Sequence, residues 1–188
     1  MSKPLRSFFA LVPDEAGIAF LLERMGLFRS RGWEKFGRFV APGDIHLTLR
    51  FLGEIDEPTS LQLQAGAAEV ARQTAPFTYT IERSVLFPRV SRARIIAAKV
   101  QPNEALQGLA RALEQVCVKA GLPPEERLFR PHLTLARLRN QMKRPNLPGK
   151  TGSILQHPPG LFLLRTSQGS TADAYEEVAR FSFAGSAA

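Results

Sequence analysis

The tetrapeptide His-Leu-Thr-Leu occurs twice in this chain, at residues 46–49 and 132–135, and it contains two of the three histidines. The two copies have similar surroundings. His46 follows Phe8, the centre of an apolar run, by 38 residues, and His132 follows Ile96, the centre of another, by 36. A segment with helical spacing lies between run and tetrapeptide each time. The sequence therefore predicts two strand–helix–strand units related by a rough twofold axis. A solenoid is excluded, because there is no third copy.

The hydrophobic pattern of the whole chain predicts an α+β fold. Apolar runs and alternation predict strands, and Asp14, Pro58 and Asn103 begin segments with helical spacing. The expected strands are 5–12, 37–44, 45–53, 77–87, 94–100, 131–138, 161–168 and 175–183, and the expected helices are 14–30, 58–74 and 103–120. The basic segment 139–153 is rich in proline and glycine and is expected to be a loop. We expect one domain, 1–188, built of two intertwined lobes. Each lobe would have an antiparallel sheet with helices on its outer face, and the cleft would lie between the lobes.

Composition limits the class of protein. With 188 residues and 44% hydrophobic content, the chain is large enough to form a core without disulfides or a structural metal. Its single cysteine, Cys117, permits no intrachain disulfide and is expected to be a core residue. No segment reaches the roughly 20 apolar residues of a membrane span. The N-terminus is expected to form a strand and not a signal peptide. We therefore expect a cytoplasmic protein without a membrane partner.

The charge favours a phosphorylated partner. The formal net charge is +8, and 19 of the 25 cationic residues are arginine. The planar guanidinium matches pairs of phosphate oxygens, which indicates RNA or another phosphorylated ligand. A genome rich in arginine codons is the alternative explanation. In and beside the basic segment, Arg137, Arg139, Lys143, Arg144 and Lys150 either guide RNA to the cleft or belong to an ordinary solvated loop.

Each tetrapeptide lies on a predicted strand, where successive side chains point to opposite faces. His46 and Thr48 therefore share one face, and the flanking leucines occupy the other. The same holds for His132 and Thr134. The leucines are expected to enter each lobe's core under its own helix. If the lobes face each other, the cleft between them contains two imidazoles and two hydroxyls.

This set of groups suits phosphodiester cleavage. One imidazole accepts a proton from the attacking water, and the other donates a proton to the departing ribose oxygen. Threonine hydroxyls donate hydrogen bonds to the non-bridging phosphate oxygens, on which charge develops. No cofactor and no metal are expected, because two histidines without a cysteine or carboxylate at ligand spacing make a poor zinc site. His157, which lacks the motif, is expected to be a loop residue.

The segments RSFFAL, HLTLRFLG and FRPHLTLAR, with their order and spacing between residue 5 and about 175, resemble the 2H phosphoesterase superfamily. Within it they resemble the RNA 2′,3′-cyclic phosphodiesterases, also called 2′-5′ RNA ligases of the LigT/ThpR type. The resemblance implies a metal-independent enzyme with a bilobal α+β fold. Such an enzyme opens a 2′,3′-cyclic phosphate to a 2′-phosphomonoester and can join RNA ends through a 2′-5′ bond. It also implies that His46 donates a proton to the leaving 3′ oxygen and that His132 activates water. Thr48 and Thr134 would hold the phosphate.

Several further residues have two interpretations. Arg130 and Arg50 share strand parity with the motif residues and are candidate phosphate or RNA contacts, or else surface residues. Phe8 either stacks on a base or, as we expect, fills the core. The segment 147–152, LPGKTG, is not a phosphate-binding loop, because arginine and not glycine lies five residues before Gly149.

Three functions remain in competition. The first is hydrolysis of RNA or nucleoside 2′,3′-cyclic phosphates by a monomeric enzyme. The second is an RNA-binding module that joins tRNA halves. The third is a phosphoesterase for a small cyclic nucleotide. Two complete His-x-Thr motifs disfavour a pure binding module, which would not need them, and the charge favours RNA over a mononucleotide.

Overall fold

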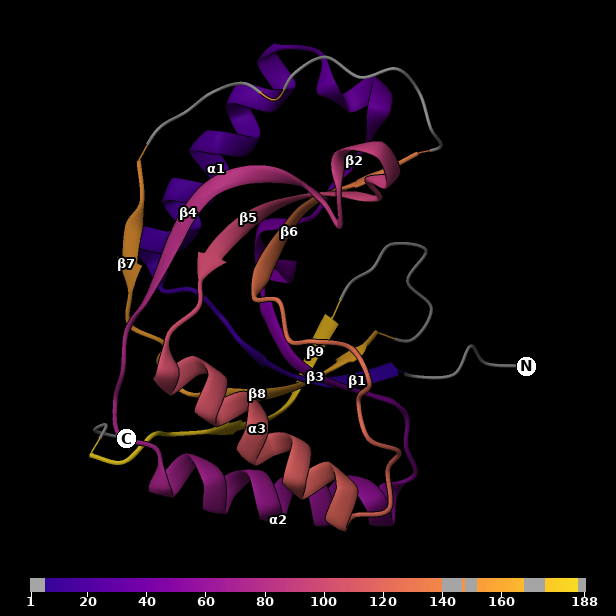
Figure 1. The fold of residues 1–188 in the computed structure, drawn as a ribbon, viewed down its shortest axis with the longest axis vertical. Helices are drawn as coiled ribbons and strands as arrows, with labels where there is room; N and C mark the ends of the chain where they lie inside the picture. Colours follow the sequence, from indigo (N-terminus) through magenta and orange to yellow (C-terminus); the bar gives the residue numbers. More distant parts are fainter. Residues whose placement is uncertain (1–5, 140–146, 148–151, 168–174, 186–188) are drawn as a thin grey trace.

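The computed structural model describes residues 6–139, 147, 152–167 and 175–185, and these form one mixed α+β unit (Figure 1). The helices are α1 (Glu15–Ser30), α2 (Glu57–Gln73) and α3 (Glu104–Lys119). The strands are β1 (Arg6–Leu11), β2 (Gly37–Phe39), β3 (Leu47–Glu54), β4 (Tyr79–Phe87), β5 (Ile95–Gln101), β6 (His132–Leu138), β7 (Ile154–Gln156), β8 (Leu161–Thr166) and β9 (Tyr175–Phe181). The predicted fold class is confirmed.

All described strands belong to one curled antiparallel sheet in the order β7-β4-β5-β6-β3-β1-β8-β9, and β2 pairs with the end of β6. The order is symmetric about the join between β6 and β3. That join is narrow, since only Leu47 and Leu133 are register partners across it. We call β3, β1, β8 and β9 the His46 half and β6, β5, β4, β7 and β2 the His132 half. The two expected lobes thus share a continuous sheet, where a separate sheet for each was predicted.

Helices α1 and α3 each pack against the half of the sheet that does not contain the strand before them. Helix α1 follows β1 of the His46 half, yet it packs against β7, and its Arg24 donates hydrogen bonds to the carbonyls of Glu82 in β4 and Gly152. Helix α3 follows β5 of the His132 half, yet it packs against β3 and α2 (Figure 1). The expectation that the motif leucines lie under their own lobe's helix is therefore wrong for β3. Pairing at the join brings each helix across to the other half.

Most of the buried side chains form one large core between the sheet and the helices, and a smaller second cluster consists of Phe8, Ala10, Phe162 and Leu164. The motif leucines Leu47, Leu49, Leu133 and Leu135 lie in the large core, and each is at most 6% exposed. Burial of a leucine stabilises a fold by roughly 1.5–3 kcal/mol, so these residues anchor both motif strands. Cys117 is also in this core, as predicted. The buried leucines thus fix both motif strands against the core, and this also fixes the positions of the residues on the opposite face of each strand.

Two local predictions need correction. The strand predicted over 37–44 ends at Phe39, and Pro42–Asp44 forms a 3₁₀ turn, because Pro42 suits the first position of a helical turn. Strand β7 was not predicted, since three residues give no periodic pattern. Lys143, Arg144 and Lys150 of the basic segment lie outside the described residues.

Candidate active site

The join between the halves brings the two motif histidines together. His46 immediately precedes Leu47 and His132 immediately precedes Leu133, and these two leucines are the register partners of the join. The proximity also has an electrostatic effect, because the charge of His132 contributes to lowering the pKa of His46. Thr48 and Thr134 are each half-buried, whereas the leucine before each threonine is fully buried. The two His-x-Thr pairs therefore lie on the face opposite the core, and we call this side of the two motif strands the cleft.

A β-bulge follows each threonine, at the same place in both motifs. In β3, Thr48 pairs with Ala10 but Arg50 pairs with Phe9, which leaves Leu49 unpaired. In β6, Thr134 pairs with Ala97 but Ala136 pairs with Ile96. A bulge adds one residue to a strand and so reverses the alternation of side chains beyond it.

This reversal explains why Arg50 does not reach the cleft. Its buried guanidinium forms an ion pair with Glu114 of α3 and donates to the carbonyls of Phe51 and Pro123. The prediction of Arg50 as a phosphate contact assumed unbroken alternation and is not supported. Phe51 takes the cleft face instead, is 50% exposed, and its ring centroid lies 5.9 Å from that of Phe8.

Both imidazoles are oriented by the same hydrogen bond. Nδ1 of His46 lies 2.7 Å from the carbonyl oxygen of Asp44, and Nδ1 of His132 lies 2.7 Å from that of Arg130. A carbonyl only accepts, so Nδ1 carries the proton in each ring. Nε2 of each neutral imidazole is then the ring nitrogen that can accept a proton, and that can donate one when the ring is charged.

His46 is enclosed by aromatic rings. The ring of Phe8 in β1 stacks on it at 4.7 Å, and the ring of Tyr175 in β9 meets it edge-on at 4.9 Å. Asp44 fixes this arrangement, because its carboxylate accepts a hydrogen bond of 3.1 Å from the backbone N–H of Tyr175. Burial lowers the pKa of His46 to about 4, with smaller lowering contributions from Arg137 and His132, while the bond to Asp44 acts in the opposite direction.

His132 is covered by a different strand. The ring of Phe87, at the end of β4, stacks on it at 4.2 Å, and the guanidinium of Arg130 lies 4.6 Å from the centroid of the same phenylalanine ring. Arg130 also donates to the carbonyl of Pro88 at 3.4 Å. Burial is the main cause of the lowered pKa of His132, and the nearby Arg130 charge adds to it, against the hydrogen bond to the Arg130 carbonyl. Arg130 is thus beside His132, as its parity predicts.

Two site residues were missed by sequence reasoning. Arg137, which we had placed with the basic loop, lies in β6 beyond the bulge, and its guanidinium donates to the hydroxyl of Tyr175 at 3.2 Å. Its charge acts on His46 across the join. The sequence carried no signal for either residue, because the bulge that places Arg137 is defined by the partner strand and Tyr175 reaches His46 only through the fold.

Other candidates lie elsewhere or are absent from the described region. The backbone N–H of His157 donates to Asp14 at 3.5 Å in a loop outside the site. Among residues that the structure describes, no three His, Cys, Asp or Glu side chains gather as a metal site. Within the same part of the chain, no helix has both the length and the apolar character to cross a membrane.

Comparison with known proteins identifies a family whose model spans both motifs. A family model described as the 2′-5′ RNA ligase superfamily matches residues 32–151, a span that contains both His-x-Thr motifs. This chain belongs to the 2′-5′ RNA ligase superfamily. The resemblance seen in the sequence is confirmed.

Among its curated relatives in this superfamily is the Escherichia coli protein named RNA 2′,3′-cyclic phosphodiesterase, which is 35% identical over 140 residues, 73% of this chain and 74% of the relative. The Thermus thermophilus protein of the same name is 28% identical over 187 residues, 96% of this chain and 91% of the relative. The match to the Bacillus subtilis relative spans little more than half of that protein, 56%.

Solved structures of the superfamily share the fold. The Thermus thermophilus protein TT0787 has a TM-score of 0.82 at 28% identity, and the match covers 96% of this chain and 98% of TT0787. Escherichia coli LigT complexed with 3′-AMP has a TM-score of 0.76 at 26% identity, with 96% of this chain and 99% of LigT covered.

Proposed function

We propose that this protein is an enzyme that opens the 2′,3′-cyclic phosphate of RNA or of a nucleoside to a 2′-phosphomonoester, without a metal ion. The observation that carries the proposal is the pair of His-x-Thr motifs at the join, each with its imidazole held by a backbone carbonyl at 2.7 Å. The curated relatives named RNA 2′,3′-cyclic phosphodiesterase support it.

In the proposed reaction, Nε2 of His132 accepts a proton from water as the water oxygen bonds to phosphorus. The bond from phosphorus to the 3′ oxygen breaks, and Nε2 of His46 donates its proton to that oxygen. Thr48 and Thr134 donate hydrogen bonds to the non-bridging oxygens. The product is a 2′-phosphate with a free 3′-hydroxyl. In the enzyme, His132 ends protonated and His46 ends neutral.

The low pKa of His46 requires an explanation, because a proton donor must be protonated. In the free protein an imidazole with a pKa of about 4 is neutral at pH 7. A bound phosphate places negative charge between Arg137 and His46, which offsets the repulsion from Arg137 and favours the imidazolium. Protonation of His46 is thus coupled to substrate binding. Arg137 serves as the cation that faces the phosphate, and Arg130 faces it from the side of His132.

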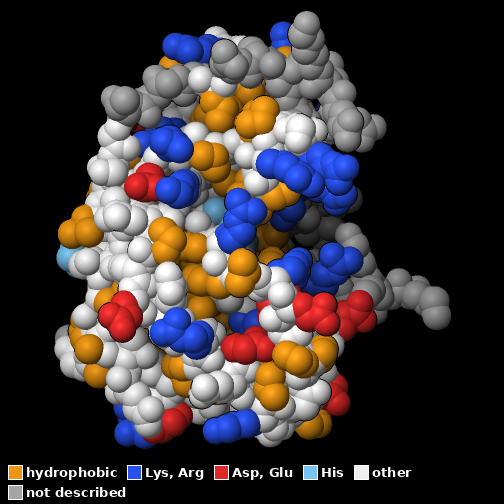
Figure 2. All heavy atoms as spheres, viewed as in Figure 1, with side chains coloured by type: hydrophobic (Ala, Val, Ile, Leu, Met, Phe, Trp, Pro, Cys, Tyr) orange, Lys and Arg blue, Asp and Glu red, His pale blue; other side chains and the backbone are white. Residues whose placement is uncertain are grey.

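RNA is the favoured substrate over a small cyclic nucleotide, because the net charge is +8 and basic side chains gather around the hollow at the right of Figure 2. In β2 and β6, Arg38 and Arg137 are register partners, and both side chains are exposed. We place the protein in the cytoplasm as a monomer. Ligation through a 2′-5′ bond is the same chemistry with an RNA 5′-hydroxyl in place of water.

The deciding experiment measures hydrolysis of 2′,3′-cyclic AMP in excess EDTA and identifies the product by chromatography. We expect 2′-AMP and not 3′-AMP, at a rate that EDTA leaves unchanged. Absence of turnover, or activity that returns only on addition of a divalent metal, contradicts the proposal.

A second measurement compares kcat/KM at low and high salt for 2′,3′-cyclic AMP and for an oligonucleotide with a cyclic phosphate end. Counterion release makes the oligonucleotide reaction fall more steeply with salt. Equal slopes would favour the small-nucleotide function.

A further inference from the structure

Tyr175 contacts the site through three different parts of the residue. Its hydroxyl accepts a hydrogen bond of 3.2 Å from the guanidinium of Arg137. Its ring meets the imidazole of His46 edge-on, with centroids 4.9 Å apart and planes at 86°, and it meets the ring of Phe8 in the same manner at 5.0 Å. Its backbone N–H donates to the carboxylate of Asp44 at 3.1 Å. One residue thus lies against the imidazole, against the ring that stacks on it, and against the nearby cation.

The contact with Asp44 ties the position of Tyr175 to that of His46. Asp44 accepts twice, because its carbonyl oxygen lies 2.7 Å from Nδ1 of His46 and its carboxylate binds the N–H of Tyr175. Tyr175 is also the first residue of β9 and pairs with Thr166 of β8. The same residue therefore holds the imidazole and the start of β9, which keeps the two rings in a fixed relative position.

Arg137 is the group that gains most from this arrangement. It is exposed on β6, and ordering a long arginine side chain costs up to about 2 kcal/mol of conformational entropy. The hydroxyl of Tyr175 selects the conformations in which the guanidinium extends towards His46, on whose pKa the charge of Arg137 acts. A cation that is already in place loses less entropy when it binds a phosphate.

No residue of the described part of the chain has the place of Tyr175 in the His132 half. Among the described residues, the only ring that contacts His132 is that of Phe87. Strand β7, at the opposite edge of the sheet from β9, pairs there with β4 at Tyr79–Ile81 and not near Phe87.

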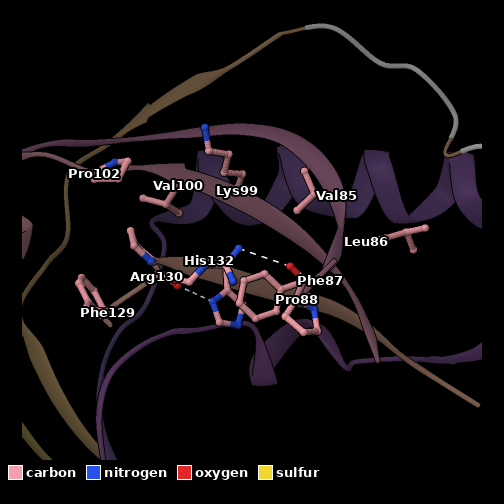
Figure 3. Close-up of a pocket in the computed structure, with 11 residues that line it drawn as sticks. Val85, Leu86, Phe87, Pro88, Lys99, Val100, Pro102, Phe129, Arg130 and His132 are labelled. Carbon is pink, nitrogen blue, oxygen red and sulfur yellow. Dashed lines mark hydrogen bonds between the residues drawn. The ribbon is translucent and has the colours of Figure 1, made fainter. Parts of the chain in front are cut away.

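A cavity of about 270 Å³ lies beside His132 instead (Figure 3). Its wall comes from the ends of β4 and β5 and from the segment that leads into β6. The lining includes Val85, Phe87, Lys99, Phe129, Arg130 and His132. The aromatic contact between a histidine and the neighbouring cation is therefore a feature of the His46 half.

We propose that Tyr175 is a positioning residue that holds Arg137 and His46 in one arrangement, so that the cation and the proton donor meet the same phosphate. This inference rests on the proposed function. The hydroxyl directs the guanidinium, and the ring covers the imidazole. The two parts of one side chain therefore have separable effects, which two substitutions of the same residue can distinguish.

Tyr175→Phe removes the hydroxyl and keeps the ring. We expect kcat/KM for 2′,3′-cyclic AMP to fall about three- to tenfold, mainly through a higher KM, because the hydrogen bond that orders Arg137 is lost. Tyr79→Phe is the matched control, since Tyr79 is the other of the two tyrosines and its buried hydroxyl has no hydrogen-bond partner among the described residues. This control should stay within about twofold of the wild type.

A double-mutant cycle tests whether the hydroxyl acts through Arg137. In an Arg137→Ala background, Tyr175→Phe should have little further effect on kcat/KM, because the group that it directs is absent. Proton NMR titration tests the ring. Tyr175→Ala should raise the pKa of His46 more than Tyr175→Phe does, since only the alanine variant admits water to the imidazole. Thermal unfolding checks that each variant folds.

Three outcomes overturn the inference and leave the proposed function standing. In the first, Tyr175→Phe retains the kcat/KM of the wild type, or loses no more than Tyr79→Phe. In the second, its loss is the same with and without Arg137, so the hydroxyl does not act through the guanidinium. In the third, the alanine and phenylalanine variants shift the pKa of His46 equally, so the ring has no part of its own. Failure of the wild type on 2′,3′-cyclic AMP is a different result and contradicts the proposed function.

Discussion

The His46 half and the His132 half are alike in the backbone that holds each motif, which we call the floor of the site. They differ in the side chains that surround each histidine, chiefly Phe8 and Phe87, which we call the walls. On the floor, each motif histidine bonds through Nδ1 to the carbonyl two residues before it, and each motif threonine is followed by a bulge. The walls share no such match. His46 is stacked by Phe8 from the adjacent strand β1, whereas His132 is stacked by Phe87 from β4, one strand further out.

The positions beyond the bulge show the same divergence. Counted from the histidine, Arg50 and Phe51 in β3 correspond to Ala136 and Arg137 in β6. The His46 half therefore has an arginine in the core and a phenylalanine in the cleft, and the His132 half has an alanine in the core and an arginine in the cleft. The hydrogen bonds that orient the two imidazoles are thus alike, whereas the side chains around them give the two rings different surroundings.

The largest effect is expected for the two motif histidines, which both halves share. His46→Ala and His132→Ala should each lower kcat for 2′,3′-cyclic AMP by about 10²–10⁴-fold, because each removes one proton-transfer group. The double variant should lose less than the product of the two factors, since both groups serve one step. Circular dichroism and thermal unfolding check that the variants fold. A single variant with near wild-type kcat would rule out the two-histidine mechanism.

The next comparison sets Arg50 against Ala136. Arg50→Ala leaves the partly buried Glu114 without its guanidinium partner, and we expect the free energy of unfolding to fall by roughly 3 kcal/mol. The kcat of the folded protein should change little. Urea unfolding measures the loss, and Arg50→Met combined with Glu114→Gln should recover part of it. If Arg50→Ala raised KM without lowering the free energy of unfolding, Arg50 would be a substrate contact and not a core residue.

The cleft positions Arg137 and Phe51 form the third comparison. Arg137→Ala should lower kcat/KM for 2′,3′-cyclic AMP by roughly 10- to 100-fold, since hydrogen bonds to a charged group contribute about 1.5–3 kcal/mol. Arg137→Lys should restore only part, because lysine cannot bind two phosphate oxygens with one planar group. Phe51→Ala, on the other half, should change the rate by less than about threefold. Steady-state kinetics of the three variants separate the effect of removing the positive charge of Arg137 from the effect of merely shortening an exposed side chain.

The smallest effect concerns the aromatic walls and pH. Both free-protein histidine pKa values are lowered, that of His46 to about 4, so the bell-shaped profile of kcat/KM should have its maximum below about pH 6.5. The rate falls on the acidic side as the base becomes protonated and on the alkaline side as the acid loses its proton. An optimum above about pH 7 would contradict this reasoning, since imidazole's ordinary pKa is near 6.5.

Removal of each wall should move the corresponding pKa. Phe8→Ala admits water to His46, so its pKa should rise towards the ordinary imidazole value, and Phe87→Ala should raise that of His132 by less. Proton NMR titration of the imidazole Hε1 signals measures both. Equal shifts would mean that the walls do not distinguish the two histidines.

Much of the site was accessible from the sequence, because the information was local. The two motifs, their position on strands and the burial of their leucines follow from a tetrapeptide and the alternation of a strand. Duplication with similar spacing predicted a symmetric α+β fold. The superfamily followed from the segments around the motifs, and none of this depends on which strands pair.

Only the tertiary structure decided the rest, because it depends on pairing between distant segments. A bulge is defined by the partner strand, so the sequence could not show that Arg50 turns into the core and Arg137 into the cleft. Tyr175 contacts His46 because β9 pairs with β8 at the end of the sheet. Helix α1 packs against the His132 half and α3 against the His46 half, an arrangement that depends on the pairing of the motif strands at Leu47 and Leu133. The cavity at Val85 exists because that strand end meets the segment before β6, two stretches that are far apart in the chain.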